Sequence, residues 1–440
     1  MKRYETYKEA GIGQIGEIPA CWEITRIGNL FDEISERYDV QCDVDAPLLS
    51  VSEYYGVAKR SEKIAEDSIL VRAETLDGYK KCQKNDIVSN IMLTWKGALG
   101  RSPLAGIVSP AYCVYRPRKN IDSRYFHYLF RTKAYTDLFH VHSTGLIDSR
   151  LRLYTPKFFS LYAILPTKEE QTQIASYLDQ ICDKIDALIL EAKASIEEYK
   201  LWKASIIYEA VTKGLDPNVE MRNSGVEWIG EMPSHWNVCK TLYALSMPIT
   251  DGPHTTPELY DDGVPFISAE AVSCGKKGRI AFDHMRGYIS EEFYQECSQK
   301  YIPQINDIYM IKSGATTGRV AFVNTDIKFT IWSPLAVFRS NPHRMYFKYL
   351  FYFLQSDAYQ KQVELGWTYG TQQNIGMRTL EKLKVCMPPL TEQKEIADVL
   401  DRKCDDIDTL IEEKELLVAD LEAYKKSLIF EVVTGKRKVV

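Results

Sequence analysis

The chain has 440 residues and is 45% hydrophobic, enough to bury the cores of about three domains of ~150 residues each. Its formal net charge of −5 argues against a uniformly basic chain, but the acid is concentrated: residues 167–214 and 391–440 carry −3 and −4, which leaves +2 elsewhere. No apolar run approaches the ~18–20 residues of a membrane span, and the first residues lack the apolar stretch of a signal peptide, so we expect a cytoplasmic protein.

The sequence contains the same unit twice, and this repeat decides the expected architecture. A lead-in segment from Ile15 to Trp22 recurs from Ile229 to Trp236 at an offset of 214 residues. Residues 161–189 match residues 383–411 without a gap, at an offset of 222. Each half is therefore a lead-in segment anchored by its tryptophan, a divergent block and a long helix. This order is expected of two related modules that recognise different targets.

The first block (residues 23–160) shows short β-patterned runs followed by a helical YFHYLF patch, which we interpret as core packing rather than a base-stacking surface. Its polar, aromatic and basic loops carry side chains that suit phosphates and base edges. The candidate DNA-contacting residues of this block are Tyr55, Lys59, Arg60, Lys96, Arg101, Ser143, Thr144, Arg150 and Arg152.

The first long helix is predicted to begin after Pro166, with Thr167 and Glu170 forming a capping box, and to stop at Gly214. Apolar residues recur in steps of four and three, which is typical of a coiled-coil seam. The predicted seam consists of residues 174, 178, 181, 185, 188, 192, 199, 202 and 206. Cys182 fits the same helix as a small buried hydrophobe.

The second block (residues 237–382) has the same overall pattern, and its loops DGPHTTPELY, KSGATTGR and WTYGTQQNIGMR are rich in polar side chains on glycine-containing frames. Glutamine or asparagine can bind adenine by two hydrogen bonds, arginine can bind guanine, and threonine can contact a phosphate or a thymine methyl. A plain turn for GATTG and a solvated loop for the Gln-Gln-Asn run are the alternatives. The candidate DNA-contacting residues are His254, Thr255, Thr256, Lys312, Ser313, Thr316, Thr317, Arg319, Tyr369, Thr371, Gln372, Gln373, Asn374 and Arg378.

The second long helix follows Pro388-Pro389, with Thr391 as a candidate cap and Gly435 as its stop. Its predicted seam is Ile396, Leu400, Ile407, Leu410, Leu417, Leu421, Tyr424 and Leu428. A lone helix with one apolar seam must bury it, and the other copy is the nearest partner, so an antiparallel pair is expected. At ~1.5 Å per residue each helix would measure ~65 Å, close to two turns of B-DNA at ~34 Å each. A spacer between the two blocks is favoured over a helical hairpin inside a core.

Motifs for catalysis are missing from the sequence. There is no G-x-x-x-x-G-K-[ST] loop for ATP, and no Asn-Pro-Pro-aromatic tetrad typical of amino-methyltransferases. Ten cysteines form no C-x-x-C pair, and His140 and His142 have no companion at metal-ligand spacing. We therefore expect no catalytic residues, no metal site and no cofactor.

Taken together, these residues resemble the specificity subunits of type I restriction–modification systems over nearly the whole chain. The resemblance rests on the two IGE-x-P-x-x-W lead-in segments, on the P-x-x-x-EQ and PP-x-x-EQ helix starts, and on G-T-Q-Q-N-I at residues 370–375. The order of block, helix, block and helix is itself diagnostic. The first block departs from the pattern, since S-T-G-L-I-D-S-R replaces a G-T-x-Q-x-N run.

The resemblance implies a non-catalytic, mixed α+β protein that binds a bipartite sequence in double-stranded DNA, with one target-recognition domain for each half. It also implies that the helices fix the unread spacer and dock two modification subunits, which bind S-adenosylmethionine and methylate adenine. Restriction subunits with ATP-driven translocation and nuclease activity are further candidate partners. The implied divisions are target-recognition domain 1 at 1–160, central helix 1 at 161–214, target-recognition domain 2 at 215–382, and central helix 2 at 383–440.

Two other classes of function remain open at this point. One is a stand-alone DNA-modifying or DNA-cleaving enzyme with a cryptic site, which the missing motifs disfavour. The other is a coiled-coil scaffold without a nucleic-acid role. A scaffold would lack the steep salt dependence that phosphate contacts give to DNA affinity.

Overall fold

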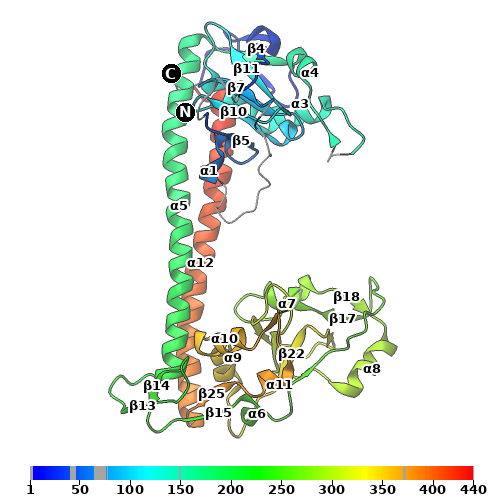
Figure 1. Cartoon of the computed structure of the whole chain (residues 1–440), viewed down its shortest axis with the longest axis vertical. Helices are drawn as coiled ribbons and strands as arrows, with labels where there is room; N and C mark the ends of the chain where they lie inside the picture. The colour runs from blue at the N-terminus through cyan, green and yellow to red at the C-terminus, as the bar shows by residue number, and fades with distance from the viewer. Residues whose placement is uncertain are drawn as a thin grey trace. The chain divides into compact units, whose positions relative to one another are not determined.

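The computed structural model describes residues 3–39, 46–63, 76, 78–147, 150–369 and 373–439. It contains two compact units, each of which is described by itself. Unit 1 comprises Met1–Glu191 with Leu417–Val440, and unit 2 comprises Ala192–Leu416. The mixed α+β class expected from the sequence is confirmed, because each unit combines small, mainly antiparallel sheets with short helices and with parts of two long helices (Figure 1).

Unit 1 is built around a four-stranded antiparallel sheet in the order β4-β11-β8-β9, formed by Phe31–Ile34, Tyr112–Pro117, Ile87–Asn90 and Leu99–Arg101. Four strand pairs or hairpins surround it. They are β1 (Tyr7–Glu9) with β2 (Glu17–Pro19), β3 (Glu23–Arg26) with β12 (Tyr162–Leu165), β5 (Leu49–Ser52) with β6 (Gly56–Lys59), and β7 (Lys80–Cys82) with β10 (Gly106–Val108). The short helices are α1 (Arg60–Lys63), α2 (Ser123–Phe130), α3 (Lys133–His142) and α4 (Thr155–Ser160).

Unit 2 repeats this plan. Its four-stranded sheet has the order β16-β22-β19-β20, formed by Thr250–Asp251, Leu335–Phe338, Ile308–Ile311 and Val320–Phe322. Around it lie β13 (Met221–Asn223) with β14 (Glu231–Pro233), β15 (Asn237–Lys240) with β25 (Lys384–Met387), and β23 (Thr368–Tyr369) with β24 (Gln373–Asn374). A second sheet, β18-β17-β21 (Gly287–Ile289, Val264–Ile267 and Thr330–Ile331), includes a parallel pair, β17 with β21, and the parallel bridge between Leu48 and Ile107 is its counterpart in unit 1. The short helices are α6 (Thr241–Ala244), α7 (Ala269–Ser273), α8 (Glu291–Lys300), α9 (Phe347–Gln355), α10 (Asp357–Leu365) and α11 (Met377–Leu380).

The repeated YF-x-YLF patches form α2 and α9, and they are core helices as predicted. Phe126 and Phe130 are fully buried in unit 1, and so are Tyr349 and Leu350 in unit 2. Burial of several aromatic rings on each short helix supplies far more stabilisation than its length alone would give. These patches are therefore not available for stacking on bases.

The two long helices are α5 (Lys168–Lys213) and α12 (Leu390–Val433). In unit 1 the beginning of α5 packs against the end of α12, and in unit 2 the end of α5 packs against the beginning of α12, so the pair is antiparallel (Figure 1). Symmetry-related ion pairs join them: Lys425 Nζ lies 2.6 Å from Asp186, and Lys203 Nζ lies 2.7 Å from Asp408. Asp186 and Lys203 lie 222 residues before Asp408 and Lys425, so the two ion pairs are equivalent under the sequence repeat.

The predicted seam is right near the helix ends and at Ala192 in the centre of α5, and wrong by one residue at five intermediate positions. Leu188, Trp202, Leu410, Leu417 and Tyr424 are 38–53% exposed, and in each case the next residue faces the partner helix more closely. An ideal helix drifts by about 20° per heptad, so a strict seven-residue pattern cannot stay on one face. Isoleucines at 174, 185, 196 and 207 are all buried, and their spacing of 11 residues fits a nearly straight helix.

Each long helix begins with a Glu-Gln pair that ties it to the neighbouring block. Glu170 Oε1 accepts the indole N–H of Trp22 at 3.3 Å, and Glu392 Oε1 accepts that of Trp236 at 3.0 Å. Both tryptophans are fully buried, which confirms their predicted role as anchors. The capping box at Thr167 and Glu170 is also present, with reciprocal contacts of 3.3 and 3.4 Å.

The glutamines of these pairs are buried and hold the polypeptide backbone. Gln171 accepts the N–H of Asp122 at 2.9 Å, just before α2, and Gln393 accepts the N–H of Tyr346 at 2.7 Å, just before α9. The expected cap at Thr391 is wrong, because α12 already begins at Leu390 and Thr391 lies inside its first turn. Gly214 and Gly435 do follow the helix ends, with positive φ angles of 78° and 72°.

The corrected seam predicts opposite outcomes for two adjacent residues of α5. Ile189→Ala removes a side chain that is 9% exposed, and it should lower the free energy of unfolding of unit 1 by about 2 kcal/mol or more. Leu188→Ala is the matched control, since Leu188 is 51% exposed and should change stability by less than about 0.5 kcal/mol. Urea unfolding followed by circular dichroism measures both. A larger loss of stability for Leu188→Ala than for Ile189→Ala would instead support the seam predicted from the sequence.

Candidate nucleic-acid interface

Three loops of the second block meet at the edge of its four-stranded sheet. Asp251 ends strand β16, and the segment that follows carries His254. Lys312 directly follows β19, and its Nζ lies 3.3 Å from Asp251 Oδ2. The third loop joins through backbone bonds: Ile375 N–H donates to Lys312 O at 2.9 Å, and Gly314 N–H to Gln373 O at 3.0 Å. The structure thus brings together the three segments that the sequence had singled out separately.

Asp251 is the charged centre of this loop cluster. Its side chain is 1% exposed, and Lys300 of α8 also pairs with it. His254 Nε2 lies 3.2 Å from Oδ2, which forms no hydrogen bond and is held by ion-pair contacts alone. A buried carboxylate needs such partners to offset its desolvation. Asp251 was not among the residues predicted from the sequence, although an acidic residue directly before Gly252-Pro253 could have pointed to it.

Gly252 explains why the turn after Asp251 needs a residue without a side chain. A Cβ at this position would lie 1.9 Å from the carbonyl oxygen of Ile331, so no other residue fits without moving the backbone. The turn therefore passes directly against the strand end that precedes Trp332. The positions of His254, Thr255 and Thr256, all exposed, are set by this packing.

The other candidates of the second block differ in the exposure of their side chains and in the contacts that these make within the protein. Gln373, Asn374 and Arg378 are exposed. Lys312 is engaged by Asp251 and is only 12% exposed, and Arg319 donates to the backbone oxygen of Ser273 at 3.1 Å. Thr317 closes its own turn by donating to Gly314 O at 2.7 Å, with Ser313 and Thr316 half-buried beside it. Tyr369 lies in β23, whereas Thr371 and Gln372 lie outside the described residues.

In the first block, Arg131 organises the surface near the β5–β6 hairpin. Its guanidinium donates to five backbone carbonyls, those of Ser52, Glu53, Tyr54, Gly97 and Leu99, at 2.8–3.3 Å. Burial lowers the pKa of Arg131 to about 10, which still leaves it charged at neutral pH. This single side chain fixes the hairpin turn next to the segment that carries Lys96.

The exposed aromatic at this turn is Tyr54, not the predicted Tyr55. Tyr54 is 84% exposed, whereas the hydroxyl of Tyr55 lies 3.0 Å from the hydroxyl of Ser50 and its ring is half-buried. In a two-residue choice such as Tyr54-Tyr55, the sequence alone does not reveal which ring faces outward. Tyr55 nevertheless lies in the same turn, and a DNA contact by this segment stays a prediction.

The buried His127 packs behind the same surface, against the β5–β6 hairpin and strand β9. Desolvation of its ring, followed by the charges of Arg131 and Arg101, lowers the pKa of His127 to about 3, so the imidazole is neutral near pH 7. Its Nδ1 accepts the backbone N–H of Arg101 at 3.2 Å. The ring packs so closely on Gly56 and Gly100 that a Cβ on either would lie 2.8–2.9 Å from it. The hairpin and β9 are thereby held together.

The remaining candidates of the first block form two groups. Lys59 and Arg60 lie on or after the β5–β6 hairpin, where Lys59 pairs with Glu62 at 3.5 Å, and Arg101 of β9 donates to Asn85 at 3.0 Å. The second group surrounds the end of α3. The rings of Trp95 and His140 contact each other at a tilt, with centroids 4.9 Å apart, and Lys96 lies over the Trp95 ring. Ser143 donates to Phe139 O at 2.7 Å. Thr144, Arg150 and Arg152 follow directly and are exposed.

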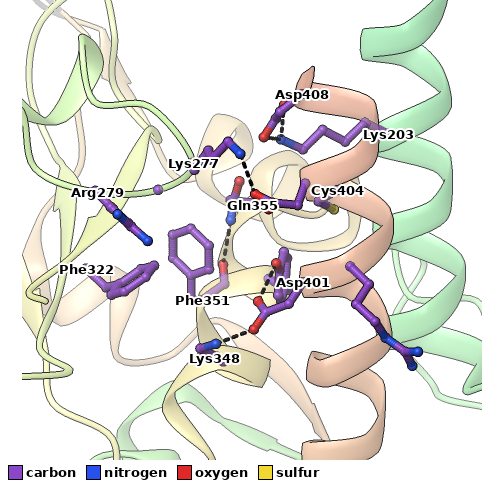
Figure 2. A pocket seen from close by; sticks show the side chains of 14 residues that line it. Lys203, Lys277, Arg279, Phe322, Lys348, Phe351, Gln355, Asp401, Cys404 and Asp408 are labelled. Carbon is purple, nitrogen blue, oxygen red and sulfur yellow. Dashed lines mark hydrogen bonds and ion pairs between the residues drawn. The ribbon is translucent and has the colours of Figure 1, made fainter. Parts of the chain in front are cut away.

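A charged crevice of about 290 Å³ lies elsewhere in unit 2, between α12 and the second block (Figure 2). Lys277 reaches across it to Asp405 at 2.8 Å, and Lys348 pairs with Asp401, whose other oxygen accepts the Tyr352 hydroxyl at 2.7 Å. Cys404 lines the crevice and is 4% exposed, so burial raises the pKa of its thiol to about 11. Because its lysines are paired with helix carboxylates, we assign this crevice to holding the block against the helix.

The described residues contain neither a cluster suited to a metal ion nor a membrane-spanning helix. No cluster of three or more His, Cys, Asp or Glu side chains with the geometry to hold a metal ion occurs among them. Among the described helices, none combines the length and apolar character needed to cross a bilayer.

The fold thus defines a class of protein in which two related α+β modules are each built on the same pair of antiparallel helices. Residues 252–418 match the family described as the type I restriction modification DNA specificity domain. The chain is 25% identical to the type I restriction enzyme MjaVIII specificity subunit of Methanocaldococcus jannaschii, over 98% of this chain and 97% of that protein. A putative MjaX specificity subunit from the same organism is 24% identical, with 98% of each chain covered.

Solved structures show the same fold. A chain from a study of complex assembly and conformational transition of the type I R-M system superposes with a TM-score of 0.67 at 16% identity, covering 94% of this chain and 98% of that one. The HsdS subunit from Thermoanaerobacter tengcongensis gives 0.50 at 16% identity, covering 96% and 98%. The resemblance inferred from the sequence is therefore confirmed, by the family match over residues 252–418 and by specificity subunits that align with nearly the whole chain.

The loop cluster of unit 2 yields a prediction for Asp251. Asp251→Asn leaves the buried Lys312 without its counter-charge, and breaking such a pair should cost about 3 kcal/mol or more in stability of unit 2. Hydrogen exchange of the amides of residues 311–317 should accelerate. Asp283→Asn is the control, because the Asp283 side chain is 82% exposed and makes only a long contact with His284. Unchanged exchange in Asp251→Asn would show that the carboxylate does not organise these loops.

Proposed function

We propose that each unit binds one half of a bipartite DNA target through the loop face described above. The observation that carries this proposal is the convergence of three polar loops of unit 2, two of which meet at the buried Asp251, while the third bonds to the backbone of Lys312 and Gly314. Their exposed amide, hydroxyl and guanidinium groups are those that hydrogen-bond base edges and phosphates. These loops fall within the matched specificity domain of residues 252–418, apart from Asp251 itself.

Within this proposal the candidate residues take different roles. Exposed side chains, such as Gln373, Asn374 and Arg378, contact the duplex directly. Engaged side chains, such as Lys312 and Arg131, position the loops that do so. The division of the chain into recognition domains at 1–160 and 215–382, with helices at 161–214 and 383–440, belongs to the same proposal. So does the idea that the helices fix the unread spacer.

We further propose that the chain is non-catalytic and acts through partner subunits in the cytoplasm. Two modification subunits would dock on the long helices, and restriction subunits would join that complex. The support comes from exposed apolar side chains on the helices that obey the 222-residue repeat. Leu188 and Leu410 are equivalent and are 51% and 38% exposed, and Trp202 and Tyr424 are equivalent and are 53% and 50% exposed.

Repeat-related apolar patches are suited to two copies of one partner. Each of these four residues directly precedes a residue that faces the other helix, so all four take the same place relative to the seam. Unit 1 carries Leu188 with Tyr424, and unit 2 carries Trp202 with Leu410. Exposed large apolar groups at matched positions are typical of protein contacts.

The modular proposal is tested by exchanging one block. Adenine methylation is first mapped genome-wide in a host that carries this chain with its modification subunits, and one recurrent bipartite motif is expected. Replacing residues 23–160 with the corresponding block of a related subunit should then change one half of the motif and leave the other half unchanged. A change in both halves would contradict recognition of one half by each unit. Methylation or cleavage by the purified chain alone would instead establish a stand-alone enzyme.

The docking proposal makes a separate prediction about stoichiometry. Leu188→Asp with Tyr424→Asp should remove one docking site, and Trp202→Asp with Leu410→Asp should remove the other. Native mass spectrometry should then find one bound modification subunit with either variant, and two with the wild-type chain. Ile305→Asp with Ile327→Asp serves as the control, since it introduces the same two charges at exposed isoleucines outside the long helices. Two bound subunits in both double variants would place the docking surface elsewhere.

A further inference from the structure

The hairpin of residues 144–152 in unit 1 takes the place that the polar loop of residues 368–374 takes in unit 2. Both follow a helix that begins with a buried Ala-Tyr pair, Ala134-Tyr135 in α3 and Ala358-Tyr359 in α10. Both are closed by antiparallel pairing that starts at a threonine, Thr144 with Arg152 and Thr368 with Asn374. The two segments are therefore counterparts, although their sequences share almost nothing.

These counterparts differ in chemistry. In the sequence, the unit 2 segment carries Thr371, Gln372 and Gln373, all polar. The unit 1 segment carries Leu146 and Ile147, here called its tip, which are 100% and 55% exposed. Two large apolar side chains at a loop tip lose the free energy that burial would supply, so their exposure calls for a binding partner.

The neck of the hairpin is built to hold this tip in place. Thr144 and Arg152 exchange two backbone hydrogen bonds of 2.9 and 3.0 Å, and Arg150 N–H donates to Ile147 O at 2.8 Å. A Cβ on Gly145 would lie 2.7 Å from the carbonyl oxygen of Arg150, so the two arms approach as closely as glycine permits. Leu153 is 2% exposed and anchors the returning arm, and its N–H donates to Ile91 O at 2.9 Å.

The surroundings of the tip are basic. Arg150 and Arg152 are exposed on the returning arm, and Lys96 is exposed beside the end of α3, where the tilted rings of Trp95 and His140 are in contact. Over residues 138–154 the sequence has two arginines, two histidines and a single acid, Asp148. An apolar tip between arginines complements a nucleic acid, which offers phosphates at its edge and an apolar base stack inside. Burial of the two apolar side chains against a protein partner would not require the neighbouring arginines.

We propose that Leu146 and Ile147 form a wedge that enters the base stack of the first half-site, while Arg150 and Arg152 bind the flanking phosphates. This inference rests on the proposed function and adds a mode of recognition to it. Unit 2 recognises its half-site through polar contacts to base edges, and unit 1 recognises its half-site through the ease with which one base step opens. Apolar wedges of leucine or isoleucine unstack and kink duplexes in this way. Flexible pyrimidine–purine steps open most easily, so such a step is expected in the first half-site.

The test uses the full chain assembled with its modification subunits and a duplex that carries the methylation motif. A 2-aminopurine replaces each adenine of the first half-site in turn, because its fluorescence rises when it is unstacked. The adenine that becomes methylated is left unreplaced, since a methyltransferase unstacks its own target base. We expect a rise at one step with the wild-type complex and none with Leu146→Ser/Ile147→Ser. Specific affinity should fall by roughly ten-fold or more, as expected when two apolar side chains lose their burial. The salt dependence of non-specific binding should stay the same, since the arginines remain.

Leu365→Ser is the matched control, because Leu365 is 69% exposed at the end of α10, just before the counterpart loop. It should preserve the fluorescence rise in the first half-site. An equal rise in Leu146→Ser/Ile147→Ser, or no rise with the wild-type complex on DNA that it binds specifically, would overturn the wedge alone. Loss of modification subunits from the double variant, with unchanged DNA binding by the chain, would make the tip a protein contact and also overturn the wedge. Absence of sequence-specific binding by the wild-type complex would instead reject the proposed function itself.

Discussion

The Glu-Gln pair at the start of each long helix is the contact on which the rest of the structure depends. Its glutamate binds the buried tryptophan of the lead-in segment, and its glutamine binds the backbone that precedes the aromatic core helix. Charge-assisted and fully buried hydrogen bonds of this kind are costly to leave unmade. The far end of the opposite helix is held too, because Tyr125 donates to Val433 O and Tyr349 to Val211 O. Each block therefore contacts the beginning of one long helix and the end of the other, and this requires the two helices to be antiparallel.

Much of this architecture could be predicted from the sequence because it is repeated there. The matches around Trp22 and Trp236, and the two Glu-Gln pairs, marked the positions that both halves need for the same contacts. The mixed α+β class, the antiparallel helices and the burial of the YF-x-YLF patches followed from periodicity and repetition. The seam failed in the middle because helical drift accumulates over several turns, and whether Leu188 or Ile189 faces inward depends on the partner helix.

The candidate interface was predictable by segment but not by residue. Polar loops on glycine frames identified the regions, yet the roles of Lys312 and Tyr55 depend on Asp251 and Ser50, which no local pattern couples to them. Arg131 looked like an ordinary residue after a core helix, although it binds five carbonyls. Most of these contacts join residues that are distant in the chain, and the same fold therefore supports two unlike loop surfaces.

The way in which α12 returns to unit 1 has a consequence for synthesis of the protein. Unit 2 is one continuous stretch, Ala192–Leu416, whereas unit 1 lacks part of its core until Leu417–Val440 has been added. Leu428, Val432 and Val433 pack within that core, and Lys436 donates to Ile15 O at 2.5 Å. Domains generally fold as they leave the ribosome, in order from the N-terminus. Here the order is reversed: the half translated second can complete its core first, and the half translated first waits for the last residues of the chain.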